Sequence, residues 1–264
     1  MWIAGLVFLL AGAGLGIAFF TQKSKLGLME GTETSTAAEL QQMAASVGSE
    51  IGKGAFSQMT EIKGTVVCDA PLTSELAQVP CVHYENRVIR EYDETYWDTD
   101  ANGNRMQRTR RGSDTVAHNA RHVFFAVDDG TGRITVDAAG AKLVTEKALS
   151  TFEPGEAHGG VLRLGSFSLS LGGLSFGSGR RTLGYRYEED VIPVGRPVYV
   201  LGEATDRNGS LRICRPADSG KMIVSVKSEE ELVRGAQRTM TWLMISAIAS
   251  AALGAVLLVV GLLT

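Results

Sequence analysis

The chain has 264 residues, a net charge of −3 and 44% hydrophobic residues. A slightly acidic chain has no basic field of the kind that attracts nucleic acid. Its three cysteines, Cys68, Cys81 and Cys214, are an odd number without the spacing of a disulfide framework. This cysteine usage is compatible with a reducing compartment.

Both ends of the chain are long uncharged runs. No Asp, Glu, Lys or Arg occurs over 1–22 or over 239–264. A helix needs about 20 apolar residues to cross a bilayer, so the sequence predicts transmembrane helices over 1–22 and 239–264. The first run has no basic start and no clear cleavage site, and we interpret it as a retained anchor rather than a signal peptide.

Basic residues flank both runs on the side of the central region: Lys23, Lys25, Arg234 and Arg238. Because cytoplasmic flanks carry an excess of Lys and Arg, this placement predicts a cytoplasmic central domain.

The stretch 23–58 is predicted to be a linker with a short amphipathic helix. Apolar residues recur there at helical spacing after Ser/Thr capping candidates, at Ala37, Leu40, Ala44, Val47 and Ile51. The stretch 228–238 begins with a serine followed by three glutamates, which predicts a helical lead into the second span.

The stretch 59–227 is predicted to be a β domain. "HVFFAVDDGTGRITVDAAGA" indicates a hairpin that turns at Asp128–Gly130, and "RPVYVLGEATD" with "SLRICRP" indicates a second one. The order of these strands and turns, with Gly64 and Gly202 where strands bend, favours an OB-like small β-barrel. The predicted fold class is therefore mainly β, with a transmembrane helix at each end. Two inserted loops are expected, over 93–119 and 153–190. The first reads as an exposed hairpin or loop, and the second is glycine-rich without a strong strand pattern.

The stretch "PCVHYENRV" carries the candidate catalytic residues. Cys81 and His83 are two apart, and on a regular strand such residues share a face. They could act as a thiol nucleophile and its base, or bind a metal with Cys68 and either His118 or His122. The favoured interpretation is a core strand in which Cys81 is a small buried hydrophobe. His118 and His122 lack the H-E-x-x-H pattern, so no metal site and no cofactor are predicted.

The candidate binding residues are Tyr84 and Arg87, expected at the surface, and Arg108, Arg110 and Arg111 in the first insert. Aromatic residues near those arginines could stack on bases, but four acids, Asp93, Glu94, Asp98 and Asp100, oppose the charge. The balance argues against nucleic acid as a partner.

Three segments together resemble the GIDE domain, also called the BAM (beside-a-membrane) domain. They are "GTVVCDAPLTSELAQVPCVHYENRV", "FFAVDDGTGRITVDAAGA" and "YRYEEDVIPVGRPVYVLGEA", and "SVKSEEELVR" with a hydrophobic helix follows. The resemblance implies that this chain corresponds to the middle region of mitochondrial membrane E3 ubiquitin ligases. In that family the domain faces away from the cytosol, opposite to the side that the charges predict.

The ligases of this family carry a RING finger after the second span, with eight Cys/His ligands for two zinc ions. The sequence has no cysteine beyond Cys214, so we expect no RING and no ubiquitin transfer by this chain alone. The predicted function is a membrane-anchored binding or scaffold module. Its partners are the bilayer and a protein that the sequence does not identify, and self-association is open. The alternatives are an E3-like component that works with a separate RING, and a thiol hydrolase that uses Cys81 and His83.

Overall fold

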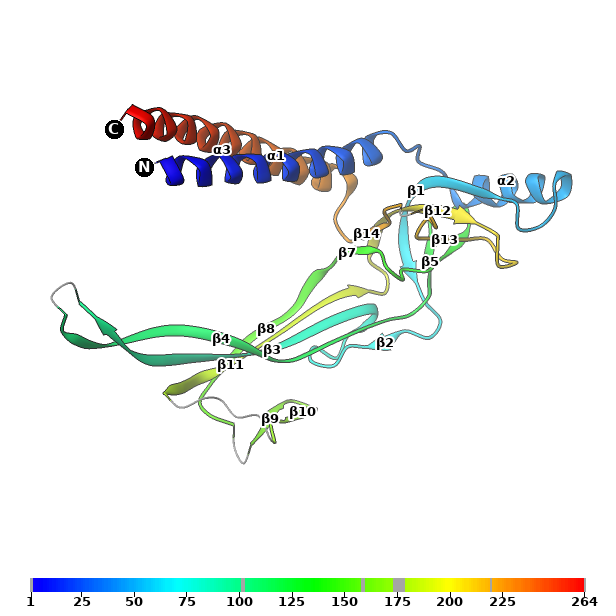
Figure 1. Cartoon of the computed structure of the whole chain (residues 1–264). Coiled ribbons are helices and arrows are strands. Elements are labelled where there is room, and N and C mark those ends of the chain that lie inside the picture. Colours follow the sequence, from blue (N-terminus) through cyan, green and yellow to red (C-terminus); the bar gives the residue numbers. More distant parts are fainter. Residues whose placement is uncertain (1, 101–102, 158–159, 173–178, 219, 264) are drawn as a thin grey trace.

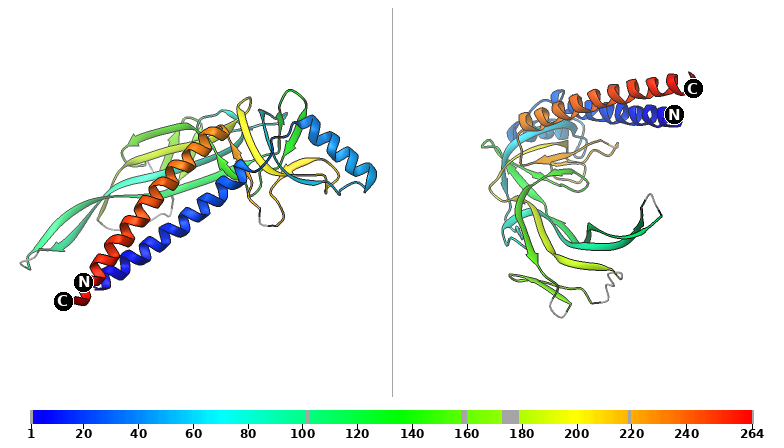
Figure 2. Two further views of the ribbon diagram at one scale, coloured as in Figure 1. Left: turned by 90° about the horizontal axis from the view of Figure 1, so that it is seen from above. Right: turned by 90° about the vertical axis from the view of Figure 1, so that its left-hand side faces the viewer.

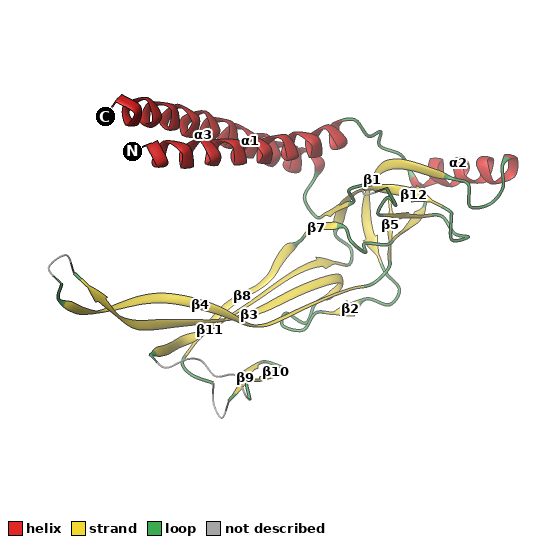
Figure 3. Ribbon diagram, in the orientation of Figure 1, coloured by secondary structure: helices red, strands yellow, loops and turns green. Residues whose placement is uncertain are grey.

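The computed structural model describes the chain except residues 1, 101–102, 158–159, 173–178, 219 and 264. A pair of long helices, a barrel with a short helix beside it, and a second sheet make up the molecule (Figure 1). The strands gather in the barrel and the second sheet, and the long helices lie outside both (Figure 3).

The barrel consists of five strands: β1 (Ser57–Val67), β5 (Phe125–Asp128), β6 (Arg133–Val136), β12 (Pro197–Thr205) and β13 (Arg212–Cys214). Their order is β1-β5-β6-β13-β12, and β12 pairs with β1 to close the barrel. Only the β6–β13 pair is parallel among these neighbours. The predicted OB-like barrel and both hairpins are confirmed. Two short strands, β7 (Lys142–Val144) and β14 (Ile223–Ser225), extend the sheet along β12.

Two glycines allow the barrel strands to approach closely. A Cβ on Gly64 would lie 2.5 Å from the Asp128 carbonyl oxygen, and one on Gly202 would lie 2.8 Å from Ile213 Cγ2. Real Cβ atoms essentially never come this near to another atom, so a side chain would push the neighbouring strand away. The glycines therefore lie at close strand contacts of the barrel.

Helix α2 (Ala37–Glu50) covers one side of the barrel core. Thr36 and Glu39 form a capping box at its first turn, and the Asp129 carboxylate accepts a hydrogen bond from the Ala37 N–H at 2.7 Å. Burial raises the pKa of Asp129, but the hydrogen bonds from Ala37 and the β5–β6 turn outweigh it, and the pKa is lowered. The core beneath α2 is aliphatic and aromatic, and includes Leu40, Phe56, Ile62, Val66, Phe125, Val127, Ile134, Val198, Val200 and Ile213.

The second sheet unites the two inserts. Its strands are β2 (Leu72–Thr73), β3 (Pro80–Thr99), β4 (Arg105–His122), β8 (Glu146–Pro154) and β11 (Arg180–Pro193). The strands β2–β4 lie in the chain between β1 and β5, and β8 and β11 lie between β6 and β12. Because β3 pairs with β4 on one edge and β11 on the other, the inserts form one structure. The first insert is the β3–β4 hairpin, and the two inserts join in one sheet, a pairing that the sequence did not predict.

The glycine-rich insert also differs from its prediction. It contains a small hairpin of β9 (Val161–Leu164) and β10 (Phe167–Ser170), followed by the long strand β11. Leu162 and Leu171 pack against Tyr185 and Tyr187 of β11, so the scattered apolar residues of the insert cover the second sheet. Residues 173–178 of this insert lie outside the described part of the chain.

The long helices α1 (Trp2–Glu30) and α3 (Glu229–Leu263) lie side by side, with both chain ends at the same end of the pair (Figures 1 and 2). The stretches Ile3–Lys23 and Glu229–Gly261 are long and apolar enough to cross a membrane. The expected helical lead and second span are one continuous helix. A Cβ on Gly5 would lie 2.8 Å from Leu258 Cγ, and one on Gly254 would lie 3.0 Å from the Gly5 carbonyl oxygen. Small residues let the two backbones approach, as is common for helices packed in membranes.

The contact between α1 and α3 can be tested with a cysteine pair. A Cβ on Gly12 would lie 3.7 Å from Ala251 Cβ, within the range of about 3.5–4.5 Å that a disulfide requires. We expect a Gly12→Cys/Ala251→Cys variant to form a disulfide that holds the two chain ends together after proteolysis of the barrel. Non-reducing electrophoresis measures this. The matched control is Gly14→Cys/Ala251→Cys, because a Cβ on Gly14 has no neighbour within 4 Å. Equal yields from the two pairs would contradict the packing.

Candidate functional site

Cys81 and His83 do not face each other. Cys81 lies opposite Pro193 and His83 opposite Ile192, so Val82 is an extra residue that forms a β-bulge in β3. Adjacent residues on β11 point to opposite faces of the sheet, and their partners Cys81 and His83 therefore do so too. Cys81 packs in a small cluster with Tyr84 and Val191, where it is fully buried.

The electrostatic surroundings of the two residues also differ. Burial, followed by the negative charge of Glu189, raises the pKa of the Cys81 thiol to about 11. Burial lowers the pKa of His83, and the charged groups that affect His83 are Glu85 and His122. A buried neutral thiol without a base beside it is a packing residue rather than an activated nucleophile. The geometry therefore supports the interpretation of Cys81 as a small buried hydrophobe in a core strand.

The histidines of β4 are not gathered into a metal site. His118 Nε2 lies 3.0 Å from Glu85 Oε1 on the neighbouring strand β3. In the part of the chain that the structure describes, no group of three or more His, Cys, Asp or Glu side chains is placed to hold a metal ion.

Tyr84 was predicted to be a surface contact, and this is wrong. Its side chain is 1% exposed, and its hydroxyl donates a hydrogen bond to Glu75 Oε1 at 2.9 Å. The segment before β3 folds back over the sheet because the buried Glu189 carboxylate accepts hydrogen bonds from the Leu76 and Ala77 N–H groups. Arg87 does lie at the surface, 3.8 Å from Asp190 Oδ2.

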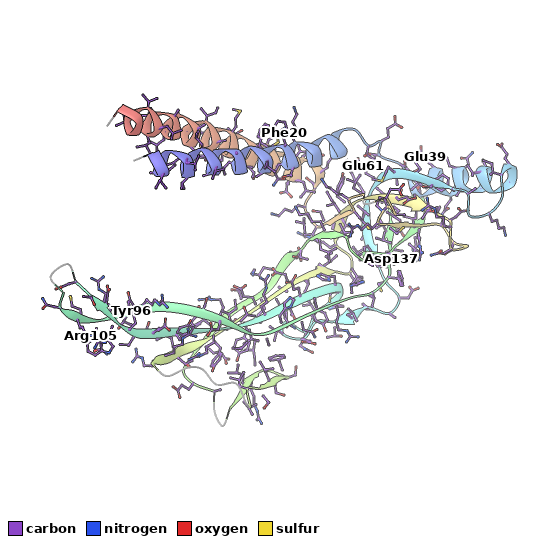
Figure 4. All side chains as sticks on the ribbon, in the orientation of Figure 1. Phe20, Glu39, Glu61, Tyr96, Arg105 and Asp137 are labelled. Carbon is purple, nitrogen blue, oxygen red and sulfur yellow. The ribbon has the colours of Figure 1, made fainter. Side chains whose placement is uncertain are left out.

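Beyond the last pairing of β3 with β11, at Glu94 and Arg180, the strands β3 and β4 continue as a two-stranded ribbon. We call residues 93–99 and 105–111 the arm, which consists of this ribbon and the last two residues of β3 that pair with β11 at its base. The arm projects from the second sheet away from the barrel (Figures 1 and 2). Tyr96 and Arg105 lie near its far end, whereas Glu61 marks the barrel (Figure 4).

One face of the arm is a ladder of arginines and tyrosines. Arg180 lies 4.6 Å from the centroid of the Tyr92 ring and donates to Glu94 at 3.0 Å. Arg110 donates to the same Glu94 at 2.6 Å and lies 5.4 Å from the centroid of the Tyr96 ring. The hydrogen bond from Arg110, then that from Arg180, lowers the pKa of Glu94. Cation–π contacts and ion pairs thus alternate along this face and order the ribbon.

The ladder depends on a glycine in β4. A Cβ on Gly112 would lie 2.6 Å from Tyr92 Cζ, so the Tyr92 ring lies directly over the backbone of Gly112. Any side chain at position 112 would displace the ring from Arg180. Farther out, Arg108 pairs with Asp98 at 3.1 Å.

The opposite face of the arm carries Trp97 and Arg111, which are both largely exposed. The Trp97 side chain is 63% exposed, and Arg105 lies 5.6 Å from the centroid of its ring. Asp93 lies 3.8 Å from Arg111 and 3.4 Å from Arg181. The structure thus brings Arg108, Arg110 and Arg111 together on one ribbon, with Arg111 82% exposed.

Sequence reasoning missed Arg180 and Arg181, the arginines of β11 that join the arm from the glycine-rich insert. Their signal in the sequence is weak, since "GRRTLGY" begins with three consecutive polar residues after the glycine and lacks the alternation of a strand. Their partners Glu94 and Asp93 are 86 and 88 positions away in the sequence. Such a pairing cannot be found from local pattern.

These features define an OB-type barrel protein with a second sheet and two terminal helices long enough to span a membrane. The chain belongs to the GIDE family, because the model of that family, described as E3 Ubiquitin ligase, matches residues 94–261, more than half of the chain. The resemblance inferred from the sequence is confirmed.

Two plant proteins are similar to part of the chain. The E3 ubiquitin-protein ligase SPL1 of Arabidopsis thaliana is 32% identical over 126 residues, which cover 47% of this chain and 34% of that protein. The E3 ubiquitin-protein ligase SP1 of the same plant is 35% identical over 115 residues, which cover 43% and 31%. The chain thus matches about a third of the length of these relatives. No solved structure matches the chain.

The structural interpretation of Cys81 predicts slow alkylation. With a thiol pKa raised to about 11, Cys81 stays protonated near neutral pH and is also shielded from reagent. We expect iodoacetamide to label the partly exposed Cys68 in the native protein, and Cys81 only after unfolding. Peptide mass spectrometry resolves the two sites. Because the native state favours the protonated thiol, this contribution to stability is present below pH 9, the ordinary value, and is lost as the pH rises toward 11.

Two substitutions provide the control. Cys81→Ser leaves a buried hydroxyl without a partner, which costs about 1–3 kcal/mol, so it should destabilise the fold more than Cys81→Ala. Chemical denaturation measures the difference. Rapid labelling of native Cys81 at neutral pH would instead support the thiol-enzyme alternative.

Proposed function

We propose that the protein is a membrane-anchored binding module that presents the second sheet and its arm to a protein partner at the membrane surface. The observation that carries this proposal is the arm itself. It is exposed on both faces, yet it is ordered in advance by the ladder from Tyr92 through Glu94 to Tyr96. A surface that is already ordered loses little conformational entropy on binding, which favours recognition.

The charges of the arm favour a protein partner over a nucleic acid. Four acids and four arginines lie between Asp93 and Arg111. The arginines Arg108 and Arg110 are already paired with Asp98 and Glu94. Nucleic-acid binding requires a net positive surface, since most of its affinity comes from phosphate contacts. Arginine and aromatic residues, which both lie on the arm, are enriched in protein–protein interfaces. A second copy of the chain is one such partner.

The second candidate is a component of a ubiquitin ligase that works with a RING supplied by another chain. Both plant relatives carry the name E3 ubiquitin-protein ligase, and the matched family model has the same description. A RING holds zinc through clusters of Cys and His. The described residues contain no such cluster, so zinc-dependent transfer would rely on ligands outside them. In this scheme the arm would bring a substrate or the RING-bearing chain to the membrane.

A photo-crosslinking experiment tests the arm as the binding surface. We expect benzoylphenylalanine at Arg111 to give a discrete adduct in native membranes. The same reporter at Lys53, an exposed residue beyond α2, should not give this adduct. Charge reversal with Arg111→Glu should lower recovery of the adduct partner in gentle detergent about tenfold, the effect of losing about 1.4 kcal/mol. The charge-matched control is Lys53→Glu. Identical adducts from both positions would rule out the arm as the docking site.

We further propose that the two helices cross the membrane and that the barrel lies on the cytoplasmic side. Both chain ends lie at the end of the helix pair away from the barrel (Figure 1). Lys23, Arg234 and Arg238 lie at the opposite, barrel end of the apolar runs. The positive-inside rule then favours a cytoplasmic barrel. Protease added to intact cells should leave the barrel uncut and should digest it after permeabilisation. Digestion in intact cells would establish the opposite orientation, which the resemblance to the family implies.

A further inference from the structure

The far end of the arm carries large apolar side chains that the protein leaves uncovered. Trp97 is 63%, Met106 46% and Tyr96 38% exposed. They lie among arginines, with Arg105 over the Trp97 ring and Arg110 over the Tyr96 ring. Trp and Tyr with arginines around them are the residues that gather at membrane–water interfaces, where an apolar ring enters the acyl boundary and a polar group stays hydrated.

The arm lies on the side of the molecule that faces the membrane. All views show the arm and the α1–α3 pair leaving the barrel toward the same side (Figures 1 and 2). Phe20 on α1 and Tyr96 on the arm both lie on this side of the barrel residue Glu61 (Figure 4). A bilayer that holds the helix pair therefore lies next to the arm rather than across the barrel from it.

The arm cannot enter the hydrocarbon. Four acids and four arginines lie between Asp93 and Arg111, and charged side chains are strongly disfavoured in the bilayer core. In addition β4 is the outer strand of the ribbon, so its free edge would place unpaired backbone N–H and C=O groups in lipid. The arm must therefore stop at the headgroups.

A contact at the headgroups requires the helix pair to turn relative to the barrel, because the arm runs alongside the pair (Figures 1 and 2). Gly27 in α1 and Gly235 in α3 fall between the apolar runs and the barrel, and a Cβ on either would have no neighbour within 4 Å. An interior glycine weakens a helix by about 1 kcal/mol relative to alanine, so these positions oppose such a turn least strongly.

We propose that the end of the arm contacts the headgroup–acyl boundary of the same bilayer that holds α1 and α3. The arm contacts the boundary with its end, so that Trp97 on one face and Tyr96 and Met106 on the other reach the boundary, and Arg105 faces the lipid phosphates. The charges of the arm balance, so the aromatic and apolar side chains provide the contact, and anionic lipid is not required. This inference rests on the proposed membrane anchoring and is independent of the protein partner.

Trp97 is itself the reporter for the test. The sequence has three tryptophans, Trp2, Trp97 and Trp242, so Trp2→Phe/Trp242→Phe leaves Trp97 as the single fluorophore. The full chain is reconstituted at low protein density into phosphatidylcholine vesicles that contain nitroxide-labelled lipids. We expect a label at the headgroup or the upper acyl chain to quench Trp97 several-fold more than a label at the chain end. Aqueous iodide should quench Trp97 less in vesicles than in detergent.

The matched control moves the reporter to the opposite end of the β region. Phe124 follows β4 at the barrel end and is 59% exposed. In a Trp2→Phe/Trp97→Phe/Trp242→Phe background, Phe124→Trp should be quenched by iodide and not by labelled lipid. If Trp97 responds to lipid labels no more than this control does, the proposed contact is overturned.

Two further outcomes decide the source of the contact. Adding phosphatidylserine should leave the quenching of Trp97 unchanged, and quenching that appears only with the anionic lipid would overturn the aromatic contact. Carbonate extraction of the same vesicles separates the two proposals. Release of the protein would overturn the anchoring and the arm contact together, whereas a retained protein with unquenched Trp97 would overturn the arm contact alone.

Discussion

The buried carboxylate of Glu61 holds the parts of the molecule together. It lies on β1 with 2% exposure, and it accepts hydrogen bonds from Thr34 in the α1–α2 linker and from Tyr199 of β12, the latter at 2.9 Å. Lys63 lies 3.5 Å away and bridges to Glu229 in the first turn of α3 at 2.7 Å. A buried charge is stable only when such partners surround it, and removing one partner leaves an uncompensated charge. The barrel, the linker from α1 and the start of α3 therefore meet at one carboxylate (Figure 4).

The start of α3 is therefore fixed to the barrel. Leu232 and Val233 of α3 pack on Tyr199 and Leu201, so the first turns of α3 belong to the barrel as much as to the helix. Gly235 lies two residues beyond Val233, and a Cβ there would have no neighbour within 4 Å. An interior glycine weakens a helix by about 1 kcal/mol relative to alanine, so α3 opposes bending less at Gly235 than in its packed first turns.

The sequence predicted those elements that are determined by residues close together in the chain. The capping residue Thr36, the turn at Asp129 and the two barrel hairpins depend on neighbours in the chain, and all appear as expected. Properties that depend on residues far apart in the chain could not be predicted from the sequence. Alternation marks β3 as a strand but does not indicate that β11 pairs with it, and the bulge at Val82, which separates Cys81 from His83, exists only in that pairing. Tyr84 is buried because Glu189, 113 positions beyond Leu76, holds the preceding segment over it.

The pairing of β3 with β11 also explains why the arm can be stiff although it is a two-stranded ribbon. An isolated hairpin is marginally stable in water, and three or more strands are usually needed. Here the inner half of β3 is fixed between β4 and β11, and Arg180, which belongs to β11, reaches out to Glu94 and Tyr92. The ladder then continues through Arg110 to Tyr96 without a third strand. The order of the sheet is thus transmitted outward by side chains, so a surface far from the barrel keeps a defined orientation relative to the second sheet.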